Sequence, residues 1–489
     1  MKKQKNRALG IEFELRLISE INAFTHAPPA IPVCVLLHMR RGGMRGSENT
    51  TATWTARWHR HIEWQRQLLV NLAAGNTPPR APRFLVLRPG DKLTVCDASG
   101  MHDLRGQCYR GTPPSRRRPL DGEHWDAFMT SGNAKLMRPL PGLGNVALSL
   151  VSAAITAVVS RRVLLLENFS APAQSFGSPM RDLILESNGW APHMADAAQL
   201  GGMTDSWAAH DDQSAFADLC RANLRSWPPS RVWRIWSNQY FAPLLLLNPH
   251  HALHVEAMAE VLGARSEESS SGGGVGERSL WTPAIRSMWV PRPELLAELS
   301  GFATRHRLDV APFVAMHVRM PLKAKQMENV ARCARERLAA NNASTLFLAT
   351  LFGANRRMLK QSLSESGHAL VWFGRTLEAQ AESKVGTDAA LADMWLMGRA
   401  REVMVNAGST FGYVAQGLSG GRATRYGGTH TSAQFVGNVG PNDCRDVGTT
   451  EASFHLLPQA TRASTACRAG EREARRRSSA LYASSTVKH

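Results

Sequence analysis

The stretch FVAMHVRM at residues 313–320 opens the part of the sequence that decides the fold. It is a short apolar run typical of a buried strand, and an amphipathic helix is predicted directly after it at 323–340. The same alternation continues with predicted strands at 345–352, 369–373 and 402–406 and predicted helices at 354–366, 387–400 and 410–419. This alternation predicts a parallel, doubly wound sheet, whose ligands bind at the carboxyl ends of the strands.

A second α/β layer is predicted upstream of this stretch. A helix over 144–159 leads into the buried strand VLLL at 163–166. Residues 1–130 are rich in Arg, Pro and Gly, with short apolar runs such as FLVL at 84–87, and no defined fold is expected there. We therefore expect four parts: a poorly specified basic region at 1–130, an α/β domain at 131–310, a doubly wound α/β domain at 311–430, and an extension at 431–489 that ends in a basic, disordered tail.

Composition and missing motifs exclude several function classes. The 489 residues carry a net charge of +18, but the basic excess lies near the two ends, for example at 116–118 and 475–477, and the body between them is nearly neutral. We therefore expect no nucleic-acid partner. The sequence has no Asp-x-Asp, Walker lysine loop or HExxH motif, which disfavours metal-dependent sugar transfer, ATPase and zinc-protease functions. Seven scattered cysteines form no metal-binding pattern.

The glycine turn Gly142-Leu143-Gly144-Asn145 precedes the first apolar helix. Free backbone N–H groups and the helix dipole can hold an anion at such a turn, and Asn145 can cap the helix or donate to a ligand. An ordinary turn with an asparagine cap explains the same residues.

His317 and Arg319 lie at the end of the predicted strand 313–320, where alternation puts both side chains on one face. A guanidinium group at this place can bind a phosphate through two hydrogen bonds and neutralise a departing diphosphate. The alternative is an arginine paired with a carboxylate.

The sequence Ser409-Thr410-Phe411-Gly412 follows the strand ending at 406 and opens a helix. Hydroxyl groups and free amides at a helix start form an anion-binding cradle, and Phe411 can line a sugar or base pocket. A plain N-cap is the alternative function of the same hydroxyls.

These features, in this order, resemble the plant xyloglucan α-1,2-fucosyltransferase family. The resemblance covers about residues 140–457 and is carried by four strings, PGLGNVALSLVSAAITAVVSRRV at 141–163, SNQYFAP at 237–243, VAMHVR at 314–319 and ALADMWLMGRAREVMVNAGSTFGYVAQGL at 390–418.

The resemblance implies a GT-B-like fold, with two Rossmann-type domains whose parallel sheets face a cleft: an acceptor-side domain at 131–310 and a nucleotide-sugar-binding domain at 311–430. It implies metal-independent, inverting transfer of fucose from GDP-fucose to a glycan of the xyloglucan or glycoprotein type, by an enzyme of the Golgi membrane with a lumenal catalytic domain. No cofactor or metal is implied. Arg319 is the implied catalytic residue, in contact with the β-phosphate. The residues implied to bind the donor are Gly142, Gly144, Asn145, His317, Arg319, Asp393, Ser409, Thr410, Phe411 and Gly412.

Two residues depart from the family's pattern and leave other functions open. Val146 replaces the arginine of the family's GLGNR string, and Ser453 replaces a cysteine, so the family's disulfide set is not intact. A catalytically inactive relative that binds a nucleotide or glycan is therefore the alternative function, and docking of the basic flanks on nucleic acid or an anionic membrane is a third.

Glu167 follows a buried strand and is considered as the catalytic base that takes the proton of the acceptor hydroxyl. The alternative is that Glu167 is an ordinary surface carboxylate.

Overall fold

The computed structural model describes most of the chain between residues 53 and 426, and one short strand beyond it. The arginine runs at 116–118 and 475–477, and most of the two expected flanks, lie outside the described residues. The described residues are 53–76, 78, 81–89, 96–97, 100–102, 108–109, 142–167, 169–208, 214–261, 278–319, 322–374, 384–406, 409–426 and 444–447.

The first sheet contains four parallel strands in the order β5-β1-β7-β6. Its strands are β1 (Phe84–Pro89), β5 (Val163–Leu166), β6 (Met203–Ala208) and β7 (Val232–Ser237). The predicted strand 163–166 is confirmed residue for residue. Leu85 in β1 pairs with Leu164 in β5 and Trp233 in β7, and all three side chains are fully buried.

The structure corrects two expectations about the ends of the folded part. Residues 1–130 are not uniformly poorly specified, because β1 lies within them and occupies an interior position of the first sheet. The helix α3 (Trp54–Ala73) also precedes residue 131 and packs on this half of the molecule. At the other end, β15 (Cys444–Val447) falls within the expected extension 431–489 yet belongs to the second sheet.

The second sheet has the order β12-β11-β10-β13-β14-β15. The four predicted strands are parallel, β14 adds a fifth parallel strand that was not predicted, and β15 pairs antiparallel with β14 at the edge. The strands are β10 (Phe313–Val318), β11 (Thr345–Thr350), β12 (Ala369–Val371), β13 (Glu402–Asn406) and β14 (Arg422–Tyr426). The helices between them are α13 (Ala324–Ala340), α14 (Gly353–Ser364), α15 (Lys384–Met397) and α16 (Thr410–Ser419), which confirm the predicted alternation with small shifts of the ends.

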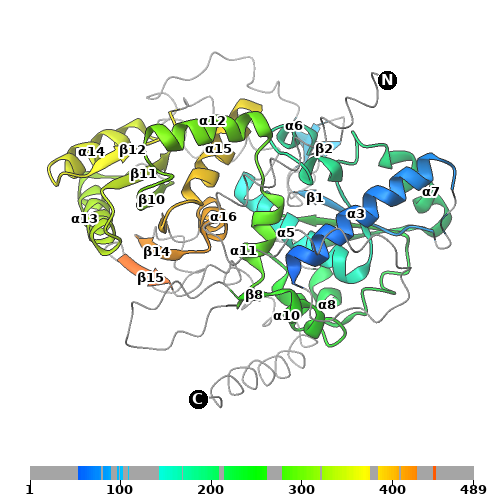
Figure 1. The fold of residues 1–489 in the computed structure, drawn as a ribbon. Coiled ribbons are helices and arrows are strands. Elements are labelled where there is room, and N and C mark those ends of the chain that lie inside the picture. Colours follow the sequence, from blue (N-terminus) through cyan, green and yellow to red (C-terminus); the bar gives the residue numbers. More distant parts are fainter. Residues whose placement is uncertain are drawn as a thin grey trace, which may run out of the picture. The chain divides into compact units, whose positions relative to one another are not determined.

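The helix α5 (Leu143–Ser160) is the most apolar helix of the first half. It is the one helix among the described residues that is long and apolar enough to cross a membrane, yet 83% of it is buried inside the protein. It packs on β1 and also touches α11 (Trp281–Met288) and α16 (Figure 1). The prediction of a buried helix over 144–159 is therefore confirmed. The helix contacts β1 of the first sheet and α16, which follows β13 of the second sheet.

The remaining elements are short or lie around the two sheets. Most helices of this group belong to the first half of the chain. The helices are α6 (Ser170–Ala173), η4 (Met180–Leu183), α7 (Trp190–Gly201), α8 (Ser214–Arg221), α9 (Pro243–Leu246), α10 (Ala252–Met258) and α12 (Pro293–Arg305). The short strands are β2 (Cys96–Asp97), β3 (Gly100–His102), β4 (Cys108–Tyr109), β8 (Glu260–Val261) and β9 (Arg278–Ser279).

Candidate functional site

Three strands of the second sheet end side by side, and polar side chains follow each of them. In the register of the sheet, His317 in β10 pairs with Val405 in β13, and Asn406 pairs with Tyr426 in β14. The hydroxyl of Tyr426 donates to the backbone oxygen of His317 at 2.6 Å and to Oδ1 of Asn406 at 3.3 Å. The backbone N–H of Arg319 donates to the same Oδ1 at 2.9 Å. Asn406 and Tyr426 therefore fix the backbone around His317 and Arg319.

The imidazole of His317 is buried between this strand end and the start of α16. Its Nδ1 lies 3.1 Å from Oγ of Ser409, and its ring stacks on Phe411 with a centroid distance of 4.4 Å. Ser409 Oγ also accepts from the Gly412 N–H at 3.4 Å, so this hydroxyl links the imidazole to the first turn of α16.

The charge state of His317 is set by its surroundings. Burial, and next the positive charge of Arg319, lower the pKa of His317 to about 3. The imidazole is therefore neutral at physiological pH. Arg319 itself is exposed, and so is accessible to a ligand.

The start of α16 combines the Ser409 cap with close packing on β13. A Cβ atom added at Gly412 would lie 2.4 Å from Cγ1 of Val405, so only glycine lets the helix approach the strand this closely. Thr410 and Phe411 are partly buried and begin the helix. The predicted N-cap is confirmed at Ser409, and the free N–H groups of the first turn lie beside His317.

The glycine turn of the first half reaches the same place. A Cβ atom added at Gly144 would lie 2.6 Å from the backbone nitrogen of Phe411 and 2.6 Å from the backbone carbon of Thr410. The N-terminal turns of α5 and α16 therefore touch, with no room for a side chain between them. Because each helix start carries partial positive charge, their contact creates a local excess of N–H donors.

Asn145 and Val146 differ from their sequence-based expectations. The N-cap of α5 is Gly142, and no side chain caps the helix, so Asn145 is not the cap. Asn145 lies in the first turn and is partly buried. Val146 is 2% exposed and packs in the hydrophobic core. A valine therefore suits this position for packing reasons.

Asp393 lies on α15 and is partly buried, so it is not a plain helix-surface carboxylate. Burial raises the pKa of Asp393 to about 8, against the opposing influence of Arg356. Arg356 donates through Nη2 to the backbone oxygen of Thr350, the last residue of β11, at 2.7 Å, and its guanidinium lies 5.9 Å from the ring centroid of Trp372. Asp393 is thus associated with the ends of β11 and β12, while His317 belongs to the end of β10.

Glu167 follows β5 and lies between two arginines. Its Oε2 is 3.6 Å from Nε of Arg234 and 4.0 Å from Nη1 of Arg88. Two guanidinium groups therefore occupy the surroundings of this carboxylate, and the geometry does not favour Glu167 as a general base.

The structure brings together most of the predicted site residues. Gly144, His317, Arg319, Ser409, Thr410, Phe411 and Gly412 form one connected group, with Gly142 and Asn145 in the first turn of α5 and Asp393 placed through Arg356. Sequence analysis missed Asn406, Tyr426 and Arg356. Asn406 was signalled by its place at a strand end, whereas Tyr426 belongs to a strand that was not predicted. Among the described residues, no group of three or more His, Cys, Asp or Glu side chains could hold a metal ion.

Comparison with known proteins relates this site to a known fold. No protein-family model matches the sequence, and no curated protein matches it. Among solved structures, an arginine-to-lysine mutant of Arabidopsis thaliana FUT1 in complex with GDP aligns with a TM-score of 0.54 at 14% identity, covering 83% of this chain and 84% of that chain. A structure of NodZ α-1,6-fucosyltransferase soaked with GDP-fucose aligns with a TM-score of 0.37 at 15% identity, covering 63% of this chain and 95% of that chain. A second structure in the comparison is of the fucosyltransferase NodZ from Bradyrhizobium. POFUT1 in complex with GDP-fucose aligns with a TM-score of 0.33 at 11% identity, covering 69% of this chain and 94% of that chain.

Of these three alignments, the one with FUT1 exceeds a TM-score of 0.5, and at 14% identity it shows a shared fold. This chain therefore has the GT-B-like α/β fold that its sequence predicts, built on two parallel sheets.

Proposed function

We propose that the protein transfers fucose from GDP-fucose to a hydroxyl group of a glycan, with inversion and without a metal ion. The observation that carries this proposal is the contact of Gly144 with Thr410 and Phe411, which joins two helix N-termini beside His317 and Arg319. This is an arrangement suited to a diphosphate. The shared fold with FUT1, whose solved structure holds GDP, supports the choice of nucleotide.

The chemistry follows from where charge develops during the transfer. Breaking the bond between fucose and phosphate leaves positive charge on the sugar and negative charge on GDP. Arg319 and the N–H groups of α5 and α16 stabilise the negative charge as it forms, which lowers the barrier without a metal ion. Neutral His317 holds Ser409 and Phe411 in place through the contact of its Nδ1 with Ser409 Oγ and the stacking of its ring on Phe411.

The finer assignment rests on the sequence resemblance. We propose an α-1,2 linkage to a galactoside of a xyloglucan-like or glycoprotein glycan, and a lumenal location in the Golgi with membrane association. The disulfide between Cys333 and Cys444 supports an oxidising compartment.

Replacing Arg319 by Ala tests the proposal. Loss of one donor to a developing anion costs about 10²- to 10³-fold in kcat, so we expect transfer to fall by that factor or more while the melting temperature stays unchanged, because Arg319 is exposed. Arg357→Ala, at an exposed position of α14, is the matched control and should keep full activity.

Calorimetric titration with GDP and with GDP-fucose, in EDTA, should precede this assay. Binding of both ligands followed by release or transfer of fucose supports the proposed enzyme. Binding without turnover would instead favour the inactive nucleotide-binding relative. An Arg319→Ala protein with wild-type activity would contradict the role assigned to Arg319.

A further inference from the structure

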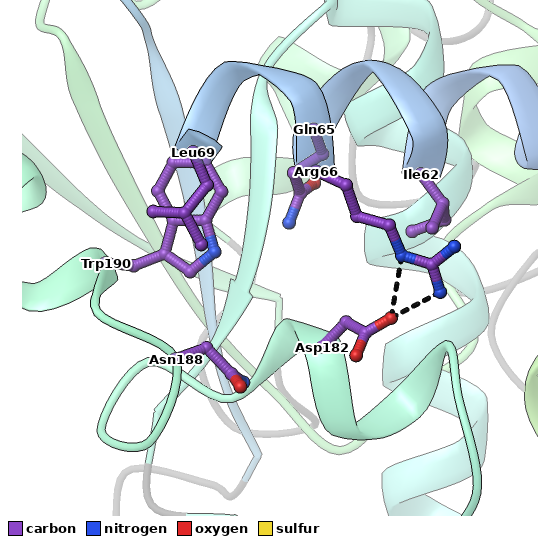
Figure 2. Close-up of a pocket in the computed structure, with 7 residues that line it drawn as sticks. All are labelled: Ile62, Gln65, Arg66, Leu69, Asp182, Asn188 and Trp190. Atoms are coloured by element: carbon purple, nitrogen blue, oxygen red, sulfur yellow. Dashed lines mark hydrogen bonds and ion pairs between the residues drawn. The ribbon is translucent and has the colours of Figure 1, made fainter. Parts of the chain in front are cut away.

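A small hollow of about 140 Å³ lies between α3, η4 and α7 (Figure 2). Its two charged side chains are paired with each other, because Arg66 on α3 donates to Oδ2 of Asp182 through Nε at 3.0 Å and through Nη2 at 2.5 Å. The Ser178 hydroxyl donates to the same carboxylate oxygen at 2.9 Å. These contacts fasten α3 to η4, and we assign no ligand to this hollow.

A larger hollow, of about 490 Å³, lies at the amino ends of three strands of the second sheet. It is lined by the segments that lead into these strands, with Pro312 before β10, Ser344 before β11 and His368 before β12. The proposed donor site, in contrast, lies at the carboxyl ends of β10 and β13. A strand of six residues is roughly 17–20 Å long, so the hollow and the donor site lie at opposite ends of the sheet.

The turn between α13 and β11 borders this larger hollow. The helix ends in a Schellman motif, in which the N–H of Asn342 donates to the backbone oxygen of Ala339 at 3.1 Å and the N–H of Ala343 donates to that of Leu338 at 2.9 Å. Asn342 takes the left-handed position of this motif, with a φ of 49°, which asparagine adopts more readily than most residues. Its side chain is exposed, while Leu338 and Ala343 are buried in the core.

The helix end explains an asparagine at position 342 but not the hydroxyl group two residues later. Ser344 is exposed and borders the same hollow, and its backbone oxygen accepts from the N–H of Ala369 at 2.9 Å. Among the described residues, neither the Asn342 amide nor the Ser344 hydroxyl makes a side-chain hydrogen bond. Together with Ala343 they form an Asn-x-Ser triplet, the acceptor pattern of N-linked glycosylation.

We propose that Asn342 carries an N-linked glycan. In the attachment step, Nδ2 of Asn342 forms a bond to C1 of the first sugar of a lipid-linked oligosaccharide. The bond from C1 to the lipid diphosphate breaks, the diphosphate departs with the bonding electrons, and the amide gives up one proton. A bulky glycan needs a surface position, which the exposed turn and the open hollow provide. Because the donor site lies at the other end of the sheet, the glycan leaves it accessible.

This inference rests on the proposed lumenal location, because such glycans are attached in the secretory pathway, and not on the transfer of fucose. The disulfide between Cys333 and Cys444 supports the same oxidising compartment, and Cys333 lies on the helix that ends at this turn. Two further triplets begin at Asn49 and Asn168. Both of these asparagines lie outside the described residues, so the inference concerns Asn342 alone.

Peptide mass spectrometry of the full chain, expressed in a eukaryotic cell, tests the proposal. Peptide N-glycosidase converts a glycosylated asparagine to aspartate, and cleavage in water enriched in heavy oxygen labels that aspartate. We expect the peptide that contains Asn342 to carry the label. An unlabelled Asn342 overturns the proposal. If Asn49 or Asn168 is labelled and Asn342 is not, the lumenal location stands and the assignment of Asn342 alone fails.

Three variants separate the glycan from effects on the turn. Asn342→Asp and Ser344→Ala should each migrate faster than the wild type on a denaturing gel, whereas Ser344→Thr keeps the hydroxyl and should migrate as the wild type does. Aspartate also tolerates the left-handed region, and Asn342→Asp has the sequence of the enzymatically deglycosylated wild type. Unchanged mobility of both Asn342→Asp and Ser344→Ala contradicts the proposal. These measurements need neither GDP nor turnover, so they succeed or fail independently of fucose transfer.

Discussion

At the scale of single residues, His317 and Asp393 are both kept uncharged at neutral pH by burial. Burial lowers the pKa of His317 to about 3 and raises that of Asp393 to about 8. Among the described residues, Arg319 is the charged group whose electrostatic influence reaches His317 at the end of β10. In the proposed reaction, Arg319 therefore stabilises the negative charge that forms on GDP, while His317 acts as a hydrogen-bonding and stacking group.

The shifted pKa of Asp393 predicts how stability depends on pH. The unfolded chain has an aspartate pKa of about 3.9, so between that value and about 8 the unfolded state releases a proton that the folded state keeps. Stability therefore falls as pH rises through this window, by at most about 1.4 kcal/mol per pH unit. Asp393→Asn cannot ionise, and its melting temperature should vary less than that of the wild type between about pH 6 and 8.5.

Thermal melts of the two proteins across this range measure the difference. Asp196→Asn, at an exposed position of α7, is the control and should keep the wild-type dependence. Parallel curves for wild type and Asp393→Asn would show that Asp393 is already ionised at neutral pH.

At the scale of elements, the contact between the first turns of α5 and α16 predicts a glycine requirement. Gly144→Ala places a Cβ atom within 2.6 Å of backbone atoms of Thr410 and Phe411, which cannot move aside like a flexible side chain. Overpacking of this kind costs about 1–3 kcal/mol, and we expect a lower melting temperature together with weaker GDP binding. Gly142→Ala should be much milder, because nothing lies within 4 Å of its added Cβ. Equal effects of the two substitutions would argue against this contact.

The alternation of strands and helices in 313–419 was predictable because its strands are short continuous apolar runs in the sequence itself. The neighbouring strand β14 was not, since Arg422 and Arg425 make it look polar, although Arg425 is only 7% exposed. The helix α3 was missed for a similar reason. Its buried face includes Trp54, Trp58 and His61 among many polar residues, and this face becomes recognisable through its partners, as when Trp54 donates to Ser287 at 2.9 Å.

At the scale of the whole molecule, one core cluster includes residues from both sheets. Leu164 in β5 and Val403 in β13 belong to it, and α5, α11 and α16 bridge the two halves. The indole of Trp281 in α11 donates to the backbone oxygen of Tyr413 in α16 at 3.0 Å. Sequence analysis placed Gly144 and Phe411 in one site through a resemblance. Their contact depends on this long-range packing, which no local pattern encodes.

The disulfide between Cys333 and Cys444 connects the edge strand β15 to α13 across 111 residues of sequence. Cys444 pairs in the sheet with Tyr426, whose hydroxyl fixes the backbone at His317. Replacing both cysteines by serine should therefore cost about 2–4 kcal/mol of stability and also weaken GDP binding, because β15 is no longer held beside Tyr426. Thermal melts and calorimetry under non-reducing conditions measure both effects. Each single substitution should cost about as much as the pair, since either one removes the bond, whereas additive losses would mean that the cysteines act through packing alone.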